Sequence, residues 1–295
     1  MDSTTPRKRQ FTPLDAAIIA ALAGVIGYVI YKASTGLNYH WNWSVIPQFL
    51  LRFDTAEQAW KPGLLTEGLI TTVRLSIWSG ILGTAVGIAM GLFRVSPSLF
   101  KRQIAGTYVG LIRNTPPLVL IFIFYFFIGD QIMTAIRIDD FIRTLSPTAK
   151  PMMEFLFGPM ERFPQFLSAI ITLSLFEGAY IAEIVRAGIE SIESGQWEAA
   201  TALGMGRMQS MRFIILPQAM QRMLPALAGQ FISIVKDSAI VSVISIQELT
   251  FQGQQIMTTT YRSFEVWTTV LVMYFILTFA CSMIVRKLEL AMQRN

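Results

Sequence analysis

The residues best suited to chemistry in this chain are the few charged side chains that lie inside long apolar stretches. Lys236 and Asp237 are adjacent in one such stretch, and Arg113 lies in another. A charge at the centre of a bilayer costs about 2.5–3.5 kcal/mol on insertion scales, so each one needs a partner or a function. Neighbouring residues point about 100° apart on a helix, so Lys236 and Asp237 cannot neutralise one another face to face. We expect at least one of them to face another helix or a polar cavity.

These charges have a structural explanation as well as a functional one. Lys236 or Asp237 could pair with a charge on another helix, such as Arg113 or Glu177, purely for neutralisation. The two prolines at positions 116 and 117 either break a helix beside a site, as in the discontinuous helices of transporters, or only kink it. The residues leave both explanations open.

Other polar residues of the apolar stretches are weaker candidates. Thr71 and Thr72 carry hydroxyl groups, but threonine hydroxyls in membrane helices often bond their own backbone. Glu183 and Arg186 are three residues apart, which predicts a structural or gating ion pair on one helix face.

The composition indicates a membrane protein and argues against several other functions. Of the 295 residues, 53% are hydrophobic and only 15% are charged, which is less charge than a soluble surface requires. One cysteine, Cys281, and one histidine, His40, cannot form a disulfide framework or a Cys/His zinc site. No nucleophile with a neighbouring base is visible, so an enzyme is not expected. Nucleic-acid binding is not expected either, because the only basic run is Arg7–Lys8–Arg9.

Six stretches are apolar enough to cross a bilayer, which requires about 20 residues per helix. The first is followed by Lys32 and lacks a small-residue cleavage site, so it is expected to remain as an uncleaved span. The predicted spans are approximately Leu14–Tyr31, Leu64–Phe93, Ile104–Gly129, Phe163–Val185, Met223–Gln247 and Val266–Val285.

The placement of lysine and arginine predicts the orientation, because these residues concentrate on the cytoplasmic side of a membrane. With the N-terminus inside, the short cytoplasmic segments contain most of them, whereas the longer outside segments contain fewer. We therefore expect both termini, and the segment from Arg186 to Arg222, to be cytoplasmic. The cytoplasmic residues are Arg7, Lys8, Arg9, Arg94, Lys101, Arg102, Arg186, Arg207, Arg212, Arg222, Arg286, Lys287 and Arg294.

The segment at about 190–220 is expected to form two short helices joined at a glycine. Composition favours a helix from Glu198 to about Leu203, Gly204 and Gly206 interrupt it, and Pro217 is expected to end a second short apolar helix. Such a unit is suited to a groove on another protein. An amphipathic helix pair lying on lipid headgroups is the alternative.

This segment resembles the EAA loop of ABC importer permeases. In that family the loop is a coupling helix that docks on a separate ATPase. The resemblance implies a polar contact for Glu198 at the joint and a turn at Gly204, while the apolar residues fill a groove. The chain lacks the phosphate loop Gly-x4-Gly-Lys-Ser/Thr, so the partner would bind ATP and Mg, and no cofactor is expected here. The matching residues are Glu198, Ala199, Ala200, Gly204, Ile214, Leu216 and Pro217.

From about Gly68 to the C-terminus the chain resembles the permeases of polar amino-acid importers, the histidine, arginine, glutamate and glutamine group. Two motifs depart mildly from the usual Arg-Gly-Thr-Pro and Lys-Asp-Thr, and both departures could bear on substrate choice. The stretches that carry the resemblance are Gly68–Ser76, Arg113-Asn114-Thr115-Pro116 with the next three residues, Ala179–Ile189 and Lys236-Asp237-Ser238.

A zwitterionic amino acid needs an anionic partner for its ammonium group and donors for its carboxylate. We expect Asp237 to contact the ammonium side, and the motif that begins at Arg113 to supply the donors. The candidate substrate contacts are Asp237, Lys236, Ser238, Arg113, Asn114, Thr115, Thr71 and Thr72.

The chain is longer than the five-span core of this family. We predict a cytoplasmic N-terminus and first span over residues 1–33, a periplasmic segment over 34–63 and the permease core over 64–295. The segment from Asp130 to Arg162 is also longer than the connection expected there. The outside additions either contact a substrate-binding protein or are neutral insertions, because loops tolerate insertion.

We therefore predict an all-α integral membrane protein with a type I ABC importer permease fold, built as an extra N-terminal helix plus a five-helix core. The resemblance implies an inner-membrane transport subunit that moves polar L-amino acids by alternating access. Its expected partners are two ATPase subunits, a second permease that is identical or homologous, a substrate-binding protein and membrane lipid. The alternative is an ion-coupled transporter or channel with Lys236, Asp237 and Glu177 as a relay, against which the intact EAA loop argues.

Overall fold

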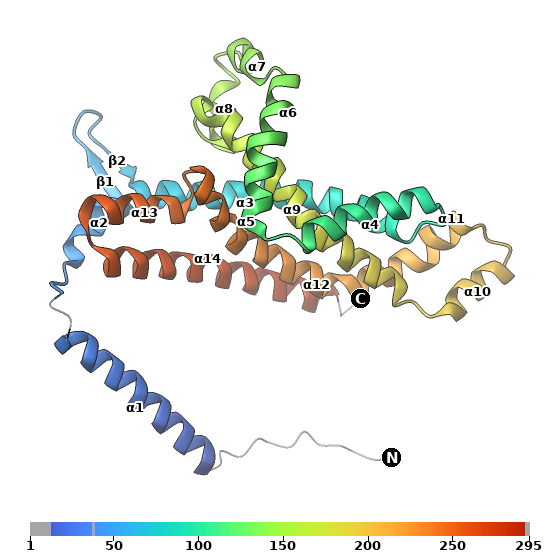
Figure 1. Ribbon diagram of the computed structural model, residues 1–295, viewed down its shortest axis with the longest axis horizontal. Coiled ribbons are helices and arrows are strands. Elements are labelled where there is room, and N and C mark those ends of the chain that lie inside the picture. The colour runs from blue at the N-terminus through green and yellow to red at the C-terminus, as the bar shows by residue number, and fades with distance from the viewer. Residues whose placement is uncertain (1–12, 37–38, 293–295) are drawn as a thin grey trace. The chain divides into compact units, whose positions relative to one another are not determined.

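The computed structural model describes residues 13–36 and 39–292, and most of these residues are helical (Figure 1). The chain divides into two compact units, Met1–Trp43 and Ser44–Asn295. In the first unit α1 (Pro13–Gly36) precedes an aromatic cluster, in which the Trp41 ring stacks on that of Trp43 at 6.0 Å. Of the predicted cytoplasmic charges, Arg7, Lys8, Arg9 and Arg294 lie outside the described residues. The predicted boundaries at residues 33 and 63 stay predictions.

Long helices build the second unit. The helices α3 (Leu64–Arg94), α9 (Phe163–Glu190), α12 (Leu216–Asp237) and α14 (Ser263–Met292) pack along one another (Figure 1). Most of α9 is buried, whereas α14 is exposed along most of its length and presents apolar side chains. Leu75, Ile121 and Leu173 form the fully buried centre of the largest apolar cluster. The core therefore surrounds α9.

Five helices of the described residues are long and apolar enough to cross a membrane. They confirm the predicted all-α membrane class with one span fewer than the six predicted. The first predicted span lies in α1, whose apolar part, Pro13–Tyr28, is shorter than the others, and a span there stays a prediction. The five helices are Leu64–Arg94, Pro117–Ala135, Met160–Glu190, Arg207–Ile244 and Ser263–Lys287.

The chain breaks inside the predicted span Ile104–Gly129, so the span was wrong as one continuous helix, whereas the break at Pro116 and Pro117 is confirmed. Helix α4 (Leu99–Arg113) ends there, and α5 (Pro117–Ile123) begins with a proline at its first turn. Proline cannot donate a backbone hydrogen bond, but it fits the first turn of a helix, where that donor has no partner. The spanning helix therefore starts at Pro117 and continues through η2 (Phe124–Gly129) and α6 (Asp130–Ala135).

Residues 130–162, predicted as a loop, form a helical arm. The arm contains α6, α7 (Ile138–Thr144), α8 (Lys150–Phe157) and η3 (Met160–Arg162). It is anchored on α3, because the ring of Trp78 stacks on that of Phe157 at 4.8 Å and its indole donates to the carbonyl of Leu156 at 3.2 Å. Buried Ile138, Met160 and Phe163 form a small core of their own.

The segment before α3 contains a β-hairpin. After η1 (Trp43–Val45) and α2 (Pro47–Leu50), β1 (Leu51–Asp54) pairs antiparallel with β2 (Ala59–Pro62), with Leu51 opposite Pro62. The Lys61 ammonium lies 2.7 Å from a carboxylate oxygen of Asp54 and lowers the pKa of that carboxyl group. The hairpin is polar at this edge and presents the exposed rings of Phe53 and Trp60.

The contact between α3 and α9 is unusually close. A Cβ atom at Gly87 would lie 2.4 Å from Cγ2 of Ile181, and one at Gly91 would lie 2.6 Å from Cβ of Val185. Small residues allow helix backbones to approach one another in membrane proteins, where packing replaces the hydrophobic effect as the driving force. Glycine is required at these positions by the side chains that face them on α9.

A buried carboxylate joins three helices. Glu248 caps α13 (Leu249–Thr260), where its oxygens accept hydrogen bonds from the backbone amides of Thr250 and Phe251 at 2.9 and 2.8 Å. The same group accepts from the hydroxyls of Tyr274 on α14 at 2.6 Å and of Thr72 on α3 at 3.4 Å. One side chain thus fixes the relative position of α3, α13 and α14.

We predict that Gly87→Ala destabilises the protein, because the added methyl group overlaps Ile181 and forces α3 and α9 apart. Overpacking of this kind costs about 1–3 kcal/mol. Gly110→Ala in α4 is the matched control, since a Cβ atom there meets nothing within 4 Å. The thermal unfolding midpoint of the purified chain in detergent measures both. Equal midpoints for the two variants would contradict the close contact.

We predict that Glu248→Ala lowers stability by about 1–3 kcal/mol, because it removes a helix cap and leaves buried donors without an acceptor. Glu248→Gln keeps one acceptor oxygen and should lose less. Tyr274→Phe removes a single donor and should lose least, since the cap remains. Chemical denaturation in detergent ranks the three variants, and a loss from Tyr274→Phe as large as that from Glu248→Ala argues against the capping role.

Candidate functional site

The segment that resembles an EAA loop forms an exposed projection at one end of α9 and α12 (Figure 1). Helix α10 (Ser194–Ala202) carries Glu198 and Ala199 on its exposed surface. Gly204 follows with φ of +73°, a left-handed conformation that glycine adopts without strain, and α11 (Arg207–Ser210) begins after it. The predicted pair of helices joined at a glycine is present.

The predicted end of the second helix at Pro217 was wrong. Helix α11 passes through the π-helical η4 (Met211–Ile215) into α12 without interruption, and Pro217 lies in the first turn of α12. Proline lacks a backbone donor, but the preceding π-turn has already shifted the hydrogen bond that this donor would make. The proline therefore does not end the helix. One helix therefore runs from Arg207 to Asp237.

The exposed apolar surface of this segment differs in part from the predicted one. Ala200 is fully buried within the chain, and Ile214 and Leu216 are half-buried. The large apolar side chains that face outward are Leu203, Met208 and Phe213, with exposed fractions of 77%, 80% and 63%. The position near the glycine turn could have indicated Leu203 and Met208 from the sequence, but not Phe213.

The segment is fastened to neighbouring elements by polar contacts. The Arg207 guanidinium lies 5.8 Å from the centroid of the Trp197 ring and donates to the carbonyl of Val95 at 3.3 Å. The amide of Gln218 donates to the side-chain oxygen of Gln196 at 3.1 Å. These bonds tie α10 to the start of α12 and to the end of α3.

A second polar group lies in the centre of the helical core. Glu177 on α9 is fully buried, and one carboxylate oxygen accepts from the side-chain amide of Gln230 on α12 at 2.6 Å. Its other oxygen has no hydrogen-bond partner among the described residues. The carboxyl group of Asp237 lies close enough to Glu177 for the two charges to interact. These three residues are named the core polar cluster.

The structure places the predicted contacts near Asp237 at the end of a helix. Lys236 and Asp237 occupy the last turn of α12, and η5 (Ser238–Ile244) continues the same candidate span. Lys236 is exposed and Asp237 is half-buried. The hydroxyl of Ser238 is buried and donates to the carbonyl of Val235 at 2.8 Å.

Arg113 does not meet Asp237. Its guanidinium lies 3.9 Å from a carboxylate oxygen of Glu183 and 5.8 Å from the centroid of the Tyr180 ring. Glu183 also pairs with Arg94 at 3.5 Å and accepts hydrogen bonds from Arg186. The predicted ion pair of Glu183 and Arg186 is therefore present within a larger cluster that joins α3, α4 and α9.

The side chains of the remaining candidate residues donate hydrogen bonds within the protein, mostly to backbone carbonyls of their own helix. The side chains of Asn114 and Thr115 donate to backbone carbonyls one turn earlier, at 2.8 and 2.7 Å. Thr71 donates to the carbonyl of Glu67 at 3.0 Å, and Thr72 donates to Glu248. Thr71 also lines two adjoining cavities of about 230 and 410 Å³, in which Arg162 donates a hydrogen bond to Gln247.

Gln230 connects the core polar cluster to a cavity of about 500 Å³ that also exposes Arg113, Glu183 and Arg222. The sequence indicated Glu177 as a counter-charge or as part of an ion relay, and it did not indicate Gln230. Gln230 precedes Asp237 by seven residues, which is two helical turns, so both share one helix face. That spacing could have indicated the pair.

The core polar cluster can accept hydrogen bonds from a ligand and can balance a positive charge. Two carboxyl groups and one amide meet there, and one buried oxygen lacks a donor. Buried polar groups without partners are costly, so the cluster favours a ligand that donates. Among the described residues no group of histidine, cysteine, aspartate or glutamate could hold a metal ion.

Sequence comparison places these features in a known context. The family model described as the binding-protein-dependent transport system inner membrane component matches residues 83–294. The chain is 35% identical over 229 residues to the glutamine transport system permease protein GlnP of Escherichia coli (strain K12), covering 76% of this chain and 93% of that protein. It is 31% identical over 242 residues to the putative GlnP of Rickettsia bellii (strain RML369-C), covering 82% and 96%.

Solved structures agree with this match. A crystal structure of an amino acid ABC transporter with histidines is similar with a TM-score of 0.60 and 33% identity, covering 77% of this chain and 92% of that one. An inward-facing structure of the MetNI methionine ABC transporter has a TM-score of 0.57 at 22% identity and shows the fold alone, covering 77% and 95%. The fold is that of a type I ABC importer permease, and the chain belongs to the family of binding-protein-dependent transport system inner membrane components.

Proposed function

We propose that this chain is the membrane-spanning subunit of an ATP-driven importer of polar amino acids. The observation that carries the proposal is the core polar cluster, in which a buried carboxylate with an unfilled acceptor position faces an amide and a second carboxyl group. An amino acid presents an ammonium group to such acceptors. The relatives named as glutamine permeases and the related amino acid transporter support this substrate class.

The shape of the EAA-like segment supports coupling to a separate ATPase. Glu198 and Ala199 are exposed on α10, with Leu203 and Met208 beside them, so the segment offers a carboxylate surrounded by apolar side chains. Gly204 provides the turn. The partner ATPase, not this chain, would bind ATP and Mg. The same residues could lie on lipid, but the family match favours a protein groove.

The helix from Arg207 to Asp237 provides a route for alternating access. Its first residues belong to the EAA-like segment, and its last turns carry Gln230 and Asp237. A displacement of this helix at the EAA-like segment would therefore also move Gln230 and Asp237 of the core polar cluster. ATP binding would draw two ATPase subunits together, and each would shift the segment that it holds.

The complete importer would contain two ATPase subunits, a second permease that is identical or homologous, and a substrate-binding protein that delivers the amino acid. It would lie in the inner membrane with both termini cytoplasmic. The ion-coupled alternative differs in one measurable respect, because uptake would continue when ATP is depleted and an ion gradient is kept. Uptake into proteoliposomes containing the ATPase, with and without ATP, separates the two.

We predict that Glu198→Ala separates ATP hydrolysis from transport, because the exposed carboxylate no longer contacts the ATPase. Loss of one charge-assisted hydrogen bond at this joint, worth about 1.5–3 kcal/mol, should lower uptake by about tenfold or more. Glu193→Ala, five residues earlier at the N-cap of α10 and also exposed, is the control. Uptake and ATP hydrolysis are measured in the same proteoliposomes, and unchanged uptake in Glu198→Ala would exclude the coupling role.

We predict that Glu177→Gln raises the KM for the transported amino acid by about tenfold, because a hydrogen bond to a charged group contributes about 1.5–3 kcal/mol. Ser174→Ala is the control, since that buried hydroxyl on the same helix bonds only to backbone carbonyls. Initial rates of uptake over a range of substrate concentrations give the KM. A KM that Glu177→Gln leaves unchanged would place the substrate elsewhere.

A further inference from the structure

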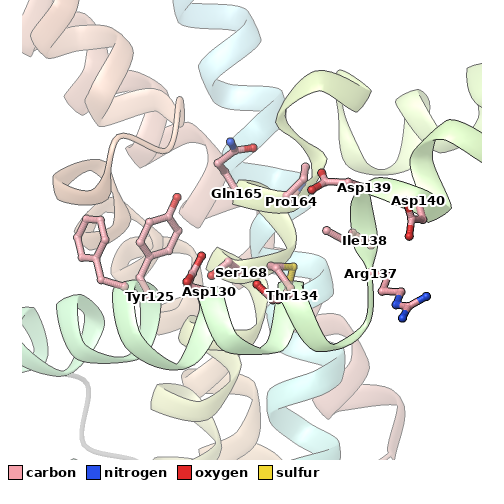
Figure 2. A pocket seen from close by; sticks show the side chains of 12 residues that line it. Tyr125, Asp130, Thr134, Arg137, Ile138, Asp139, Asp140, Pro164, Gln165 and Ser168 are labelled. Carbon is pink, nitrogen blue, oxygen red and sulfur yellow. The ribbon is translucent and has the colours of Figure 1, made fainter.

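A cavity of about 700 Å³ lies between α6, α7 and the start of α9, away from the core polar cluster (Figure 2). It belongs to the helical arm, which exceeds the connection expected of the family at this point. The predicted topology places residues 130–162 outside the membrane, so the cavity lies at the outer end of the spans to which Tyr125 and Ser168 belong. Neither the EAA-like segment nor the core polar cluster accounts for its polar side chains.

The cavity is lined by more negative than positive charge. Asp130 comes from α6 and Asp139 and Asp140 from α7, and within the described residues none of the three carboxylates has an ion pair or accepts a hydrogen bond. The single positive residue in the lining is Arg137, whose guanidinium points away from Asp130 and Ser168 in Figure 2. Unneutralised carboxylates in a concave site attract cations.

A buried hydroxyl at the base of the cavity also lacks a partner. Ser168 on α9 is only 4% exposed, and its oxygen makes no hydrogen bond within the described part of the chain. Figure 2 shows this side chain close to Asp130. Gly129 leaves room for the hydroxyl, because a Cβ atom there would lie 2.0 Å from it. A polar group that is desolvated without a partner is stabilised when a ligand supplies one.

Aromatic side chains of η2 complete the lining. Tyr125 lies beside Asp130 in Figure 2, and Phe126 also lines the cavity. Aromatic faces attract cations, and guanidinium groups stack on them. A metal ion does not fit, because the carboxylates of the described residues do not converge as a metal-ligand group.

We propose that this cavity binds an organic cation, an ammonium or guanidinium group, between Asp130, Asp139 and the hydroxyl of Ser168. The group comes either from a free cationic amino acid or from a lysine or arginine side chain of a binding protein docked on the arm. The first source makes the cavity an entry subsite, and the second makes it a docking pocket. Binding of the cation itself does not depend on the proposed transport function.

The test is protection of a cysteine placed in the cavity. Thr134→Cys is combined with Cys281→Ser in the full chain, and the rate of reaction with a membrane-impermeant maleimide is measured in proteoliposomes. L-arginine at ten times its dissociation constant should slow labelling by about tenfold, because a bound ligand occupies the site for most of the time. L-citrulline, which is similar in shape but uncharged, should give no protection.

Substitutions identify the residues responsible. Asp130→Asn should abolish protection by L-arginine, whereas Glu161→Gln, an exposed carboxylate of the same arm outside the lining, should leave it unchanged. Ser168→Ala should weaken it. Equal protection by L-arginine and L-citrulline, no protection by L-arginine, or protection that Asp130→Asn retains would each overturn the proposal.

A second ligand distinguishes the two sources of the cation. N-acetyl-L-argininamide presents only the guanidinium, as an arginine within a protein does. Protection by both compounds supports a pocket that binds a protein side chain, and protection by free L-arginine alone supports an entry subsite. Glu177→Gln should leave protection unchanged, so failure of the core polar cluster as a substrate site and failure of this cavity are separate results.

Discussion

The near contact of α3 and α9 sets the positions of the other helices. Glycines on α3 admit the side chains of Ile181 and Val185, so α9 lies buried at the centre and carries Glu177 inside the protein. Helix α12 packs against α9 as well and brings Gln230 to that carboxylate. A wider α3–α9 spacing would let lipid or water reach Glu177, and the polar group would lose its defined surroundings.

The lengths of the apolar stretches predicted the membrane class well, because the length that a spanning helix needs is set by the thickness of the bilayer. They failed near Pro116, since an apolar stretch gives the same composition whether a helix runs through it or restarts inside it. Pro217 misled in the opposite direction, because the π-turn before it lets the helix continue. The helices of residues 130–162 were missed because they are short and depend on packing, such as that of α8 on Trp78 and of Ile138 against Met160 and Phe163.

The site was partly predictable. Charged residues in an apolar sequence identify themselves, and Asp237 and Glu177 are both in the core polar cluster. The sequence could not show which residue each of these charges contacts. No sequence pattern shows which charged residue lies beside Arg113. Its neighbour in the structure is Glu183, and this contact depends on how α4 crosses α9. Similarly, Ala200 has the residue type of a contact surface, but burial of its side chain is decided by packing within the chain.

The uninterrupted helix from Arg207 to Asp237 has a thermodynamic consequence. Because one continuous helix belongs to both ends, a free-energy difference that a ligand at Gln230 imposes on the position of the whole helix also acts on the projecting segment. Such coupling is reciprocal. If a partner bound to that segment raises the affinity for the ligand, the ligand must raise the affinity for the partner by the same factor. Binding of a ligand in the interior would thereby change the affinity of the exposed segment for its partner before anything is transported.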